Sequence, residues 1–304
     1  MEFGILLFET IYTVIKQKLK DYQQLMKLNL SMLVVFSSIV GYLMVPEIKE
    51  VQISKLVLLF LGGMLVTAAA NATNELLEQD TDALMKRTMT RPLPDKRMSN
   101  KEAAIFTGIV LFVGLYILYH FFNPLSAFIA FISYLLYSFL YTPLKKITAI
   151  SVLVGAIPGS LPCLIGWVAA TNHMGSLAAW TLFILQFFWQ FPHFWSIAWI
   201  GHEDYEKAGM KMLPKEGKIG QYTAFQCVLY SAVLIPLSAL PMIAMPETYS
   251  WISFAGLVIA ATWMLYNSIL FLKDTSDLKA RKVMFASFVY LPLTLVSLII
   301  DKFI

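Results

Sequence analysis

The stretch SKLVLLFLGGMLVTAAANATNELLEQDTD, residues 54–82, joins a long apolar run to an acidic end. Residues 54–76 can cross a bilayer, which takes about 20 residues of helix. A segment inside a bilayer must satisfy its own backbone hydrogen bonds, so this one is expected to be helical. The stretch therefore predicts a transmembrane helix that brings carboxylates to one membrane surface.

The composition extends this prediction to the whole chain. Of its 304 residues 58% are hydrophobic and 14% are charged, against about 25% charged in soluble domains. The two cysteines, Cys163 and Cys227, show no metal-binding or haem-attachment spacing, and no disulfide framework is expected. Lysines and arginines form no continuous basic stripe, so no nucleic-acid partner is expected. The partner that the composition indicates is the lipid bilayer.

Apolar blocks recur along the sequence and predict an all-α, polytopic membrane bundle of about nine helices in one domain, residues 1–304. The expected spans are residues 28–46, 54–76, 104–121, 125–141, 150–171, 177–200, 223–245, 250–272 and 283–300.

The basic residues predict the orientation of the bundle. Of the 23 Lys and Arg, 20 lie before the first span or in alternate connections, namely residues 77–103, 142–149, 201–222 and 273–282. The positive-inside rule places those segments, and the N-terminal residues 1–27, in the cytoplasm. The two longest connections, 77–103 and 201–222, are expected to be functional loops over an active site.

The first acidic cluster lies at the end of the 54–76 span. On an ideal helix, one arc of about 100° carries Asn71, Asn74, Glu75, Glu78 and Asp82. Asp80 points the opposite way if the helix continues. If the helix ends before Asp80, that residue turns toward the others.

A second acidic cluster, Glu203, Asp204 and Glu206, follows the 177–200 span on the same predicted side. Carboxylates and phosphate oxygens are the ligands that Mg²⁺ prefers. Two facing clusters would hold metal ions that bridge to a diphosphate, whereas each cluster alone is equally a polar helix end. The expected metal ligands are Glu75, Glu78, Asp80, Asp82, Glu203 and Asp204.

These residues resemble a known signature. Asn74-x-x-x-Glu78-x-x-x-Asp82, followed by Arg91-Pro92-Leu93-Pro94, is similar to the first motif of the UbiA superfamily of membrane prenyltransferases. That motif usually reads NDxxDxxxD, and Glu75 and Glu78 stand here at two of its Asp positions. The second motif of the superfamily is often DxxxD, and this chain departs from it.

Three further segments resemble the haem-specific branch of the superfamily. They are YTPLKKIT at 141–148, the Gly/Pro-rich 155–167, and FPHFW at 191–195 with DYEKAGMKMLP at 204–214. The resemblance implies a nine-helix bundle with a central cavity opening to the cytoplasm, in a bacterial inner membrane. It also implies farnesyl diphosphate and haem b as substrates and Mg²⁺ as cofactor; whether the protein works alone or beside a haem A synthase is left open by the sequence.

The expected chemistry is ionisation of an allylic diphosphate. Metal ions and nearby cations neutralise the leaving group, and aromatic faces shelter the carbocation. His193 is a candidate haem ligand or, alternatively, a histidine satisfied by a helix–helix hydrogen bond. The expected catalytic residues are Asn74, Glu78, Asp82 and Lys145, and the substrate-binding ones are Asn71, Lys86, Arg87, Arg91, Tyr141, Lys146, His193 and Trp195.

Other functions remain open from sequence. A prenyltransferase of the same superfamily would act on an aromatic or quinone precursor. A transporter would carry its charges near the bilayer midplane, whereas here they cluster at one end. A structural subunit of an oxidase would have no use for two acidic clusters.

Overall fold

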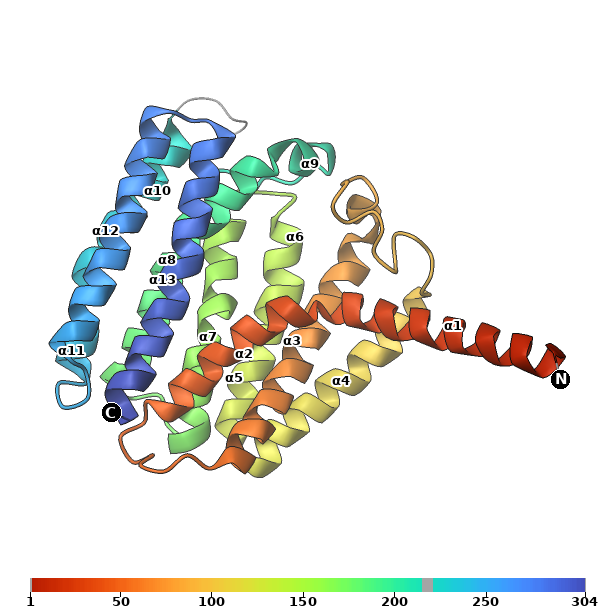
Figure 1. Ribbon diagram of the computed structural model, residues 1–304, viewed down its shortest axis with the longest axis horizontal. Coiled ribbons are helices and arrows are strands. Elements are labelled where there is room, and N and C mark those ends of the chain that lie inside the picture. The colour runs from red at the N-terminus through yellow and green to blue at the C-terminus, as the bar shows by residue number, and fades with distance from the viewer. Residues whose placement is uncertain (1, 215–220, 304) are drawn as a thin grey trace.

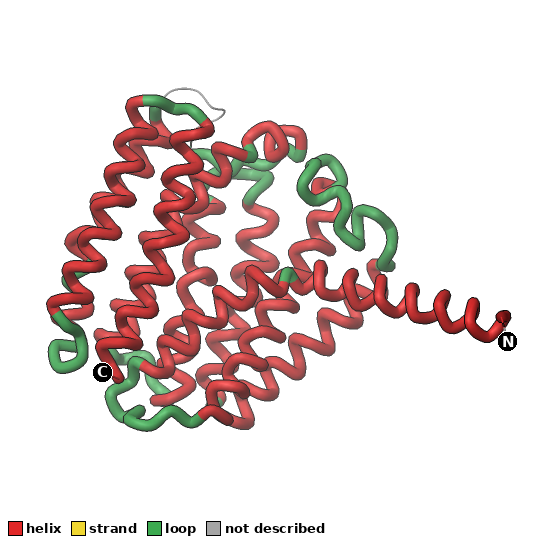
Figure 2. The backbone as a smooth tube through the Cα atoms, viewed as in Figure 1, coloured by secondary structure: helices red, strands yellow, loops and turns green. Residues whose placement is uncertain are grey.

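The computed structural model describes residues 2–214 and 221–303, and every regular element in those ranges is helical (Figures 1 and 2). Lys215 and Lys218, which contribute to the orientation prediction, lie outside them. The elements are α1 (Glu2–Met26), α2 (Leu28–Leu43), α3 (Ile53–Asp82), α4 (Asn100–Phe121), α5 (Pro124–Leu135), the π-helical turn η1 (Leu136–Tyr141), α6 (Thr142–Leu144), α7 (Ser151–Thr171), α8 (Leu177–Ile200), α9 (His202–Lys207), α10 (Tyr222–Leu237), α11 (Leu240–Ala244), α12 (Trp251–Lys273) and α13 (Asp277–Phe303). The predicted all-α fold is confirmed.

The membrane spans agree with the predicted bundle of about nine. In the described ranges, seven segments are long and apolar enough to cross a bilayer: α3, α4, residues 124–144, α7, residues 222–244, α12 and α13. The bent pair formed by Ile11–Met26 and α2 makes eight. α8 is 24 residues long and contains Gln186, Gln190 and His193, which are buried. It packs against α7, α10 and α13, so it completes the bundle.

Close approach of α2 and α7 depends on two glycines that face each other's helix. A methyl group at Gly41 would collide with the backbone carbonyl of Cys163, and one at Gly166 would collide with that of Ser38. Small residues allow this contact between membrane helices, where backbone packing replaces the hydrophobic effect as the main source of association. Gly166, in the Gly/Pro-rich segment, and Gly41 therefore allow α7 and α2 to pack closely against each other.

α1 leaves the bundle sideways, as Figure 1 shows (red, toward the N label). The chain bends by 47° between α1 and α2, at Lys27, whose φ of 48° lies in the left-handed region. This bend places the last turns of α1 beside the α3–α4 connection. The segment expected only to precede the first span is thus a helix in contact with the connection between α3 and α4.

The connection between α3 and α4 is shorter than the predicted 77–103 loop, because both helices extend into it. α3 continues through Asp82, and α4 begins at Asn100. Ser99 caps α4: its hydroxyl accepts the backbone N–H of Glu102 at 3.1 Å, the contact that Ser-x-x-Glu sequences favour. The remaining loop, residues 83–99, lies at the same end of the bundle as α9 (Figure 1).

Candidate active site

The acidic face of α3 is buried at the end of that helix nearest the 83–99 loop. Asn71, Asn74, Glu75, Glu78 and Asp82 are each at most 3% exposed. Since the helix continues to Asp82, the 3.6-residue period keeps all five on one arc. The first of the two arrangements left open by the sequence is the one observed.

Asp80 lies on the other side of α3. It is exposed and lines a separate hollow of about 450 Å³, together with Lys96 and Ser99. The structure therefore does not bring Asp80 together with the other predicted metal ligands.

Glu78 is held by a cation from a distant part of the sequence. The Lys145 ammonium lies 2.6 Å from Glu78 Oε1 and donates a hydrogen bond to Oε2 at 2.8 Å. Both side chains are less than a tenth exposed. Breaking a buried pair of this kind costs about 3–5 kcal/mol, because one charge is left without compensation.

Asn74 connects three elements around this pair. Its amide donates to Glu78 Oε2 at 2.7 Å and to the Thr142 hydroxyl at 3.1 Å. Its carbonyl oxygen accepts from the Lys27 ammonium at 2.9 Å. Asn74 thereby joins α3 to α6 and to the bend between α1 and α2. Asn71 lies one turn earlier in α3 and donates to the Met26 carbonyl at 3.2 Å.

Arg91 from the 83–99 loop bridges the remaining two carboxylates. Its guanidinium is 2.6 Å from Asp82 Oδ2 and 3.5 Å from Glu75 Oε1. The loop is fixed to the helix end by the Thr88 hydroxyl, which donates to the Asp82 carbonyl at 2.9 Å. Arg91 thus contacts two of the three carboxylates on the buried arc, Glu75 and Asp82.

Glu75 is the least satisfied group in the site. It is 0% exposed, and within residues 2–214 and 221–303 neither of its carboxylate oxygens accepts a hydrogen bond. A buried carboxylate without hydrogen bonds is costly. Oxygens of Glu75, Glu78 and Asp82 therefore fit a divalent cation, which would give Glu75 a direct partner in addition to its 3.5 Å ion pair with Arg91.

The described side chains do not enclose an ion by themselves: in those ranges no three His, Cys, Asp or Glu are grouped closely enough to do so. Mg²⁺ usually binds through one or two carboxylates plus substrate phosphates and waters, without an all-protein cage. A diphosphate substrate would supply the remaining oxygens, so the carboxylates present are sufficient.

The second acidic cluster is divided by the fold. Asp204 lines a cleft of about 210 Å³ with Arg87, Tyr205 and Arg281. Glu203 is exposed, and Glu206 lies 3.8 Å from His202 on the outer side of α9. Of the second cluster's predicted ligands, Asp204 is the one that faces a cleft.

The two long loops meet at this end of the bundle. Arg87 from the first loop lines the cleft with Asp204 from the second, and the Lys211 backbone N–H donates to the Lys145 carbonyl at 2.6 Å. Lys86 and Lys146, also predicted to bind substrate, are exposed at the same end. The cations with contacts to the acidic face of α3 are Lys27, Arg91 and Lys145, whereas none of the α3 carboxylates lines the cleft that contains Arg87 and Asp204.

Aromatic rings lie beside the charged groups. The Lys145 ammonium is 4.9 Å from the centre of the Tyr141 ring, and Tyr137 packs against Tyr141 at 5.3 Å. Both tyrosines belong to η1, a π-helical turn of the kind that is frequent at functional sites. Trp195 is instead buried in a cluster with Phe191 and Tyr230.

His193 makes the helix–helix contact that was one of its two sequence interpretations. Its Nδ1 is 2.8 Å from the Ser287 hydroxyl of α13, and the ring stacks on Trp189 at 4.8 Å. The hydrogen bond engages Nδ1 only. A partner on one ring nitrogen is also how ligating histidines are oriented, so haem contact through Nε2 stays a prediction.

Sequence reasoning missed three residues of this region. The sequence uses Lys27 and Arg281 only as markers of orientation, and Thr142 only as part of a segment that resembles the family. The sequence offers one signal for Lys27. It is a cation directly before a membrane span, and the next span carries Asn71 and Asn74, one of which it contacts. Arg281 is 77 positions from Asp204 in sequence, and only the fold brings them to one cleft.

Comparison with known proteins gives a consistent result. A model of the UbiA prenyltransferase family matches residues 34–289. The protoheme IX farnesyltransferase of Flavobacterium psychrophilum is 43% identical over 293 residues, which are 95% of this chain and 97% of the relative. That of Cytophaga hutchinsonii is 38% identical over 282 residues, 92% of this chain and 97% of the relative.

Solved structures share the fold. A digeranylgeranylglyceryl phosphate synthase superposes with a TM-score of 0.76 at 24% identity, covering 94% of this chain and 99% of that one. A UbiA homologue from Archaeoglobus fulgidus, bound to GPP and Mg²⁺, gives 0.60 at 17% identity, covering 91% and 99%. Because the family model spans most of the sequence and the relatives are matched almost end to end, the chain belongs to the UbiA prenyltransferase family.

Proposed function

We propose that this protein transfers the farnesyl group of farnesyl diphosphate to a vinyl group of haem b, giving haem O and diphosphate. The observation that carries the proposal is the buried acidic face of α3, with Lys27, Arg91 and Lys145 converging on it from three separate segments. Relatives named protoheme IX farnesyltransferase, matched over 92–95% of the chain, support haem as the acceptor.

The role of the acids is to bind the diphosphate through Mg²⁺. One or two carboxylates among Glu75, Glu78 and Asp82 would hold the metal together with phosphate oxygens, with Asp204 as the candidate from the second loop, and bound Mg²⁺ would neutralise the charge of the leaving diphosphate. Mg²⁺ with a prenyl diphosphate in the Archaeoglobus homologue supports this choice of cofactor. Asp80 and Glu203, both exposed, are the weaker members of the predicted ligand set.

The cations would act on the same leaving group. Arg91 and Lys145 are oriented by their carboxylate partners and are available as donors to phosphate oxygens. Arg87, Lys86 and Lys146 would extend the basic rim. Such preorganised charges stabilise the developing diphosphate without reorganisation during the reaction. Asn74, which donates to Glu78 and accepts from Lys27, would hold these two side chains in position.

The transfer itself leaves little bond-making for the protein. The C1–O bond of farnesyl diphosphate breaks, and the electron pair leaves with diphosphate. A vinyl carbon of haem forms the new bond to C1, and water adds to the other vinyl carbon and loses a proton. Tyr137 and Tyr141 would shelter the allylic cation, since aromatic faces attract cations.

The location of the site follows from the same proposal. The end of the bundle that carries residues 83–99 and α9 would face the cytoplasm of a bacterial inner membrane, with the N-terminal segment on that side. The chain would work as a single prenyltransferase domain, with haem A synthase as the partner that consumes its product.

A direct test uses purified protein with farnesyl diphosphate, Mg²⁺ and either haem b or 4-hydroxybenzoate. We expect diphosphate to be released when haem b is the acceptor and not when 4-hydroxybenzoate is. Release only with 4-hydroxybenzoate would reject the haem assignment and favour the aromatic acceptor. No release with either acceptor would reject transfer altogether.

A further inference from the structure

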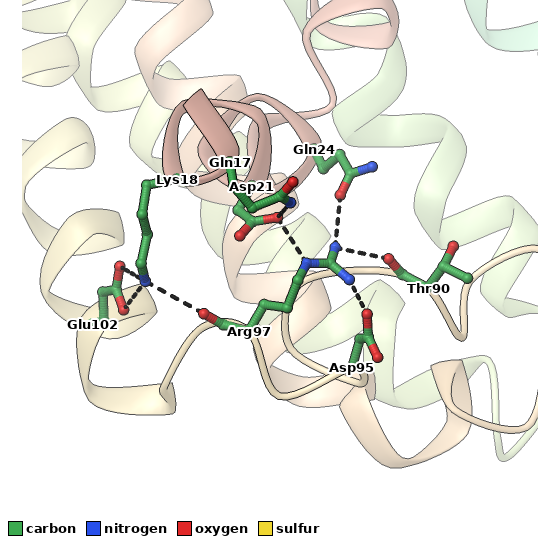
Figure 3. A network of polar contacts seen from close by, with 8 residues as sticks. All are labelled: Gln17, Lys18, Asp21, Gln24, Thr90, Asp95, Arg97 and Glu102. Atoms are coloured by element: carbon green, nitrogen blue, oxygen red, sulfur yellow. Dashed lines mark hydrogen bonds and ion pairs between the residues drawn. The ribbon is translucent and has the colours of Figure 1, made fainter. Parts of the chain in front are cut away.

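Arg97 ties the active-site loop to α1. Its Nε donates to Asp21 Oδ1 at 2.9 Å, and its Nη2 donates to Gln24 Oε1 at 3.1 Å (Figure 3). Asp21 is 1% exposed and also accepts from Gln17 of its own helix at 2.9 Å. One guanidinium thus binds two consecutive turns of α1.

The same residue holds the loop on both sides of Arg91, with its side chain on one side and its backbone on the other. Its Nη2 also donates to the Thr90 carbonyl at 2.9 Å, as Figure 3 shows, and Thr90 directly precedes Arg91. The Arg97 backbone N–H donates to the Pro92 carbonyl at 2.9 Å, and Pro92 directly follows Arg91. The backbone that carries Arg91 is therefore fixed from both neighbours by one residue.

α1 is itself firmly placed. Leu25, Leu93, Met98, Ala72 and Ala103 form a buried cluster that joins α1, the loop, α3 and α4. Next to this cluster, the Lys18 ammonium lies 2.9 Å from Glu102 of α4. Because Arg97 is bonded both to this packed part of α1 and to the loop, it holds the loop in a fixed position relative to the helix.

We infer that Arg97 is a positioning residue for Arg91: by clamping Thr90 and Pro92 against α1, it sets where the Arg91 guanidinium lies relative to Glu75 and Asp82. The inference rests on the proposed function, in which Arg91 binds the diphosphate. It makes the last turns of α1 part of the active site, although α1 contributes no side chain to Glu75, Glu78 or Asp82.

The expected consequence is a loss specific to prenyl diphosphate. Arg97→Gln removes the charge and the planar fork of donors, which a single amide cannot replace. A displaced Arg91 would bind the diphosphate less well, since misplacement of about 1 Å can cost up to about 100-fold in rate. We expect kcat/KM for farnesyl diphosphate to fall about 10-fold, with KM for haem b unchanged. Asp21→Asn should give a smaller loss of the same kind.

Glu102→Gln is the matched control. It breaks the ion pair between Lys18 of α1 and α4 and removes no partner of the Arg97 guanidinium, although Lys18 also donates to the Arg97 carbonyl at 3.3 Å. Its kcat/KM should stay within about twofold of the parent protein. An equal loss in Glu102→Gln and Arg97→Gln would show that general docking of α1 matters, and it would overturn a specific role of Arg97.

The decisive readout is a double-variant cycle. If Arg97 acts through Arg91, the variant Arg91→Gln/Arg97→Gln should be no worse than Arg91→Gln alone, because coupled residues are non-additive. Independent, multiplying losses would contradict the inference. Should Arg97→Gln fail to fold, Arg97→Lys, which keeps the charge but cannot engage Asp21, Gln24 and Thr90 together, is expected to show the same non-additivity.

A binding measurement separates this inference from the proposed function. Farnesyl diphosphate with Mg²⁺ should raise the melting temperature of the parent protein and of Glu102→Gln, and raise that of Arg97→Gln less. This shift needs no acceptor. If haem is not farnesylated but the shift follows this pattern, the acceptor is wrong and the role of Arg97 stands. Equal shifts in all three proteins would overturn the role of Arg97.

Discussion

The Lys145 ammonium lies 2.6 Å from a carboxylate oxygen of Glu78, although 67 positions separate the two residues in sequence. The pair is buried where α3 ends, beside Asn74 and Thr142. In the proposed reaction both members act on the same diphosphate, one through a metal ion and one directly. The pair therefore fixes the place where the leaving group would bind.

Removal of the Glu78 charge should impair the reaction strongly. Glu78→Gln deprives the proposed metal of a ligand and leaves Lys145 buried without its counter-charge. We expect kcat/KM for farnesyl diphosphate to fall at least about 100-fold, or ~2.7 kcal/mol of transition-state stabilisation. Asp80→Asn is the matched control, since it makes the same carboxylate-to-amide change on the exposed side of α3. A loss of less than about threefold is expected there. Equal effects in the two variants would remove the reason for placing the site on the buried arc.

Arg91 should not be replaceable by lysine. The guanidinium bridges Asp82 and Glu75, at 2.6 and 3.5 Å, and a lysine has one charged nitrogen for both tasks. Arg91→Lys is expected to raise KM for farnesyl diphosphate about 10-fold, while KM for haem b stays the same. Lys101→Gln, an exposed cation in the first turn of α4, serves as the control for a change of local charge. Full activity of Arg91→Lys in steady-state assays would show that a point charge is enough.

Metal dependence should be complete and should involve Glu75. Chelation of divalent ions is expected to abolish transfer, and Mg²⁺ should restore it. Because Glu75 is buried without hydrogen bonds, Glu75→Gln should raise the Mg²⁺ concentration for half-maximal activity about tenfold, ~1.4 kcal/mol. Titration of Mg²⁺ against initial rate measures this shift. Undiminished turnover in excess EDTA would refute the metal assignment.

Much of this site follows from one periodicity. The residues Asn71, Asn74, Glu75, Glu78 and Asp82 share an arc because a helix repeats every 3.6 residues, and this could be predicted once residues 54–82 were assigned to a helix. Whether the helix extended past Glu78 could not be predicted, since the pattern alone left Asp80 with two possible orientations. The continuation of α3 to Asp82 decides it.

The partners of these acids could not be predicted. Pairing of Glu78 with Lys145, or of Asn74 with Lys27, depends on how α6 and the α1–α2 bend pack against α3. The sequence assigns Lys145 a catalytic role and Lys146 a substrate-binding one, but it does not show that Lys145 is buried whereas its neighbour Lys146 is exposed. The role of Arg97 is hidden for the same reason, because its contacts join segments 76 positions apart.

Orientation in the membrane can be tested by cysteine labelling. The native Cys163 and Cys227 are buried, so an introduced cysteine should give the only strong signal with an impermeant reagent. Asp95→Cys, in the exposed part of the 83–99 loop, is expected to react from the cytoplasmic side. Met174→Cys, in the connection between α7 and α8, should react from the outside. The reverse pattern would place the acidic face of α3 on the wrong side for the proposed topology.

The most direct test of the proposed function is mass spectrometry of haem after incubation with the protein, farnesyl diphosphate and Mg²⁺. We expect haem b to gain the mass of one farnesyl group and one hydroxyl group, in an amount equal to the diphosphate released. Glu78→Gln should yield almost none of this product. Unmodified haem b in the presence of active prenyl transfer to another acceptor would contradict the assignment of haem as substrate.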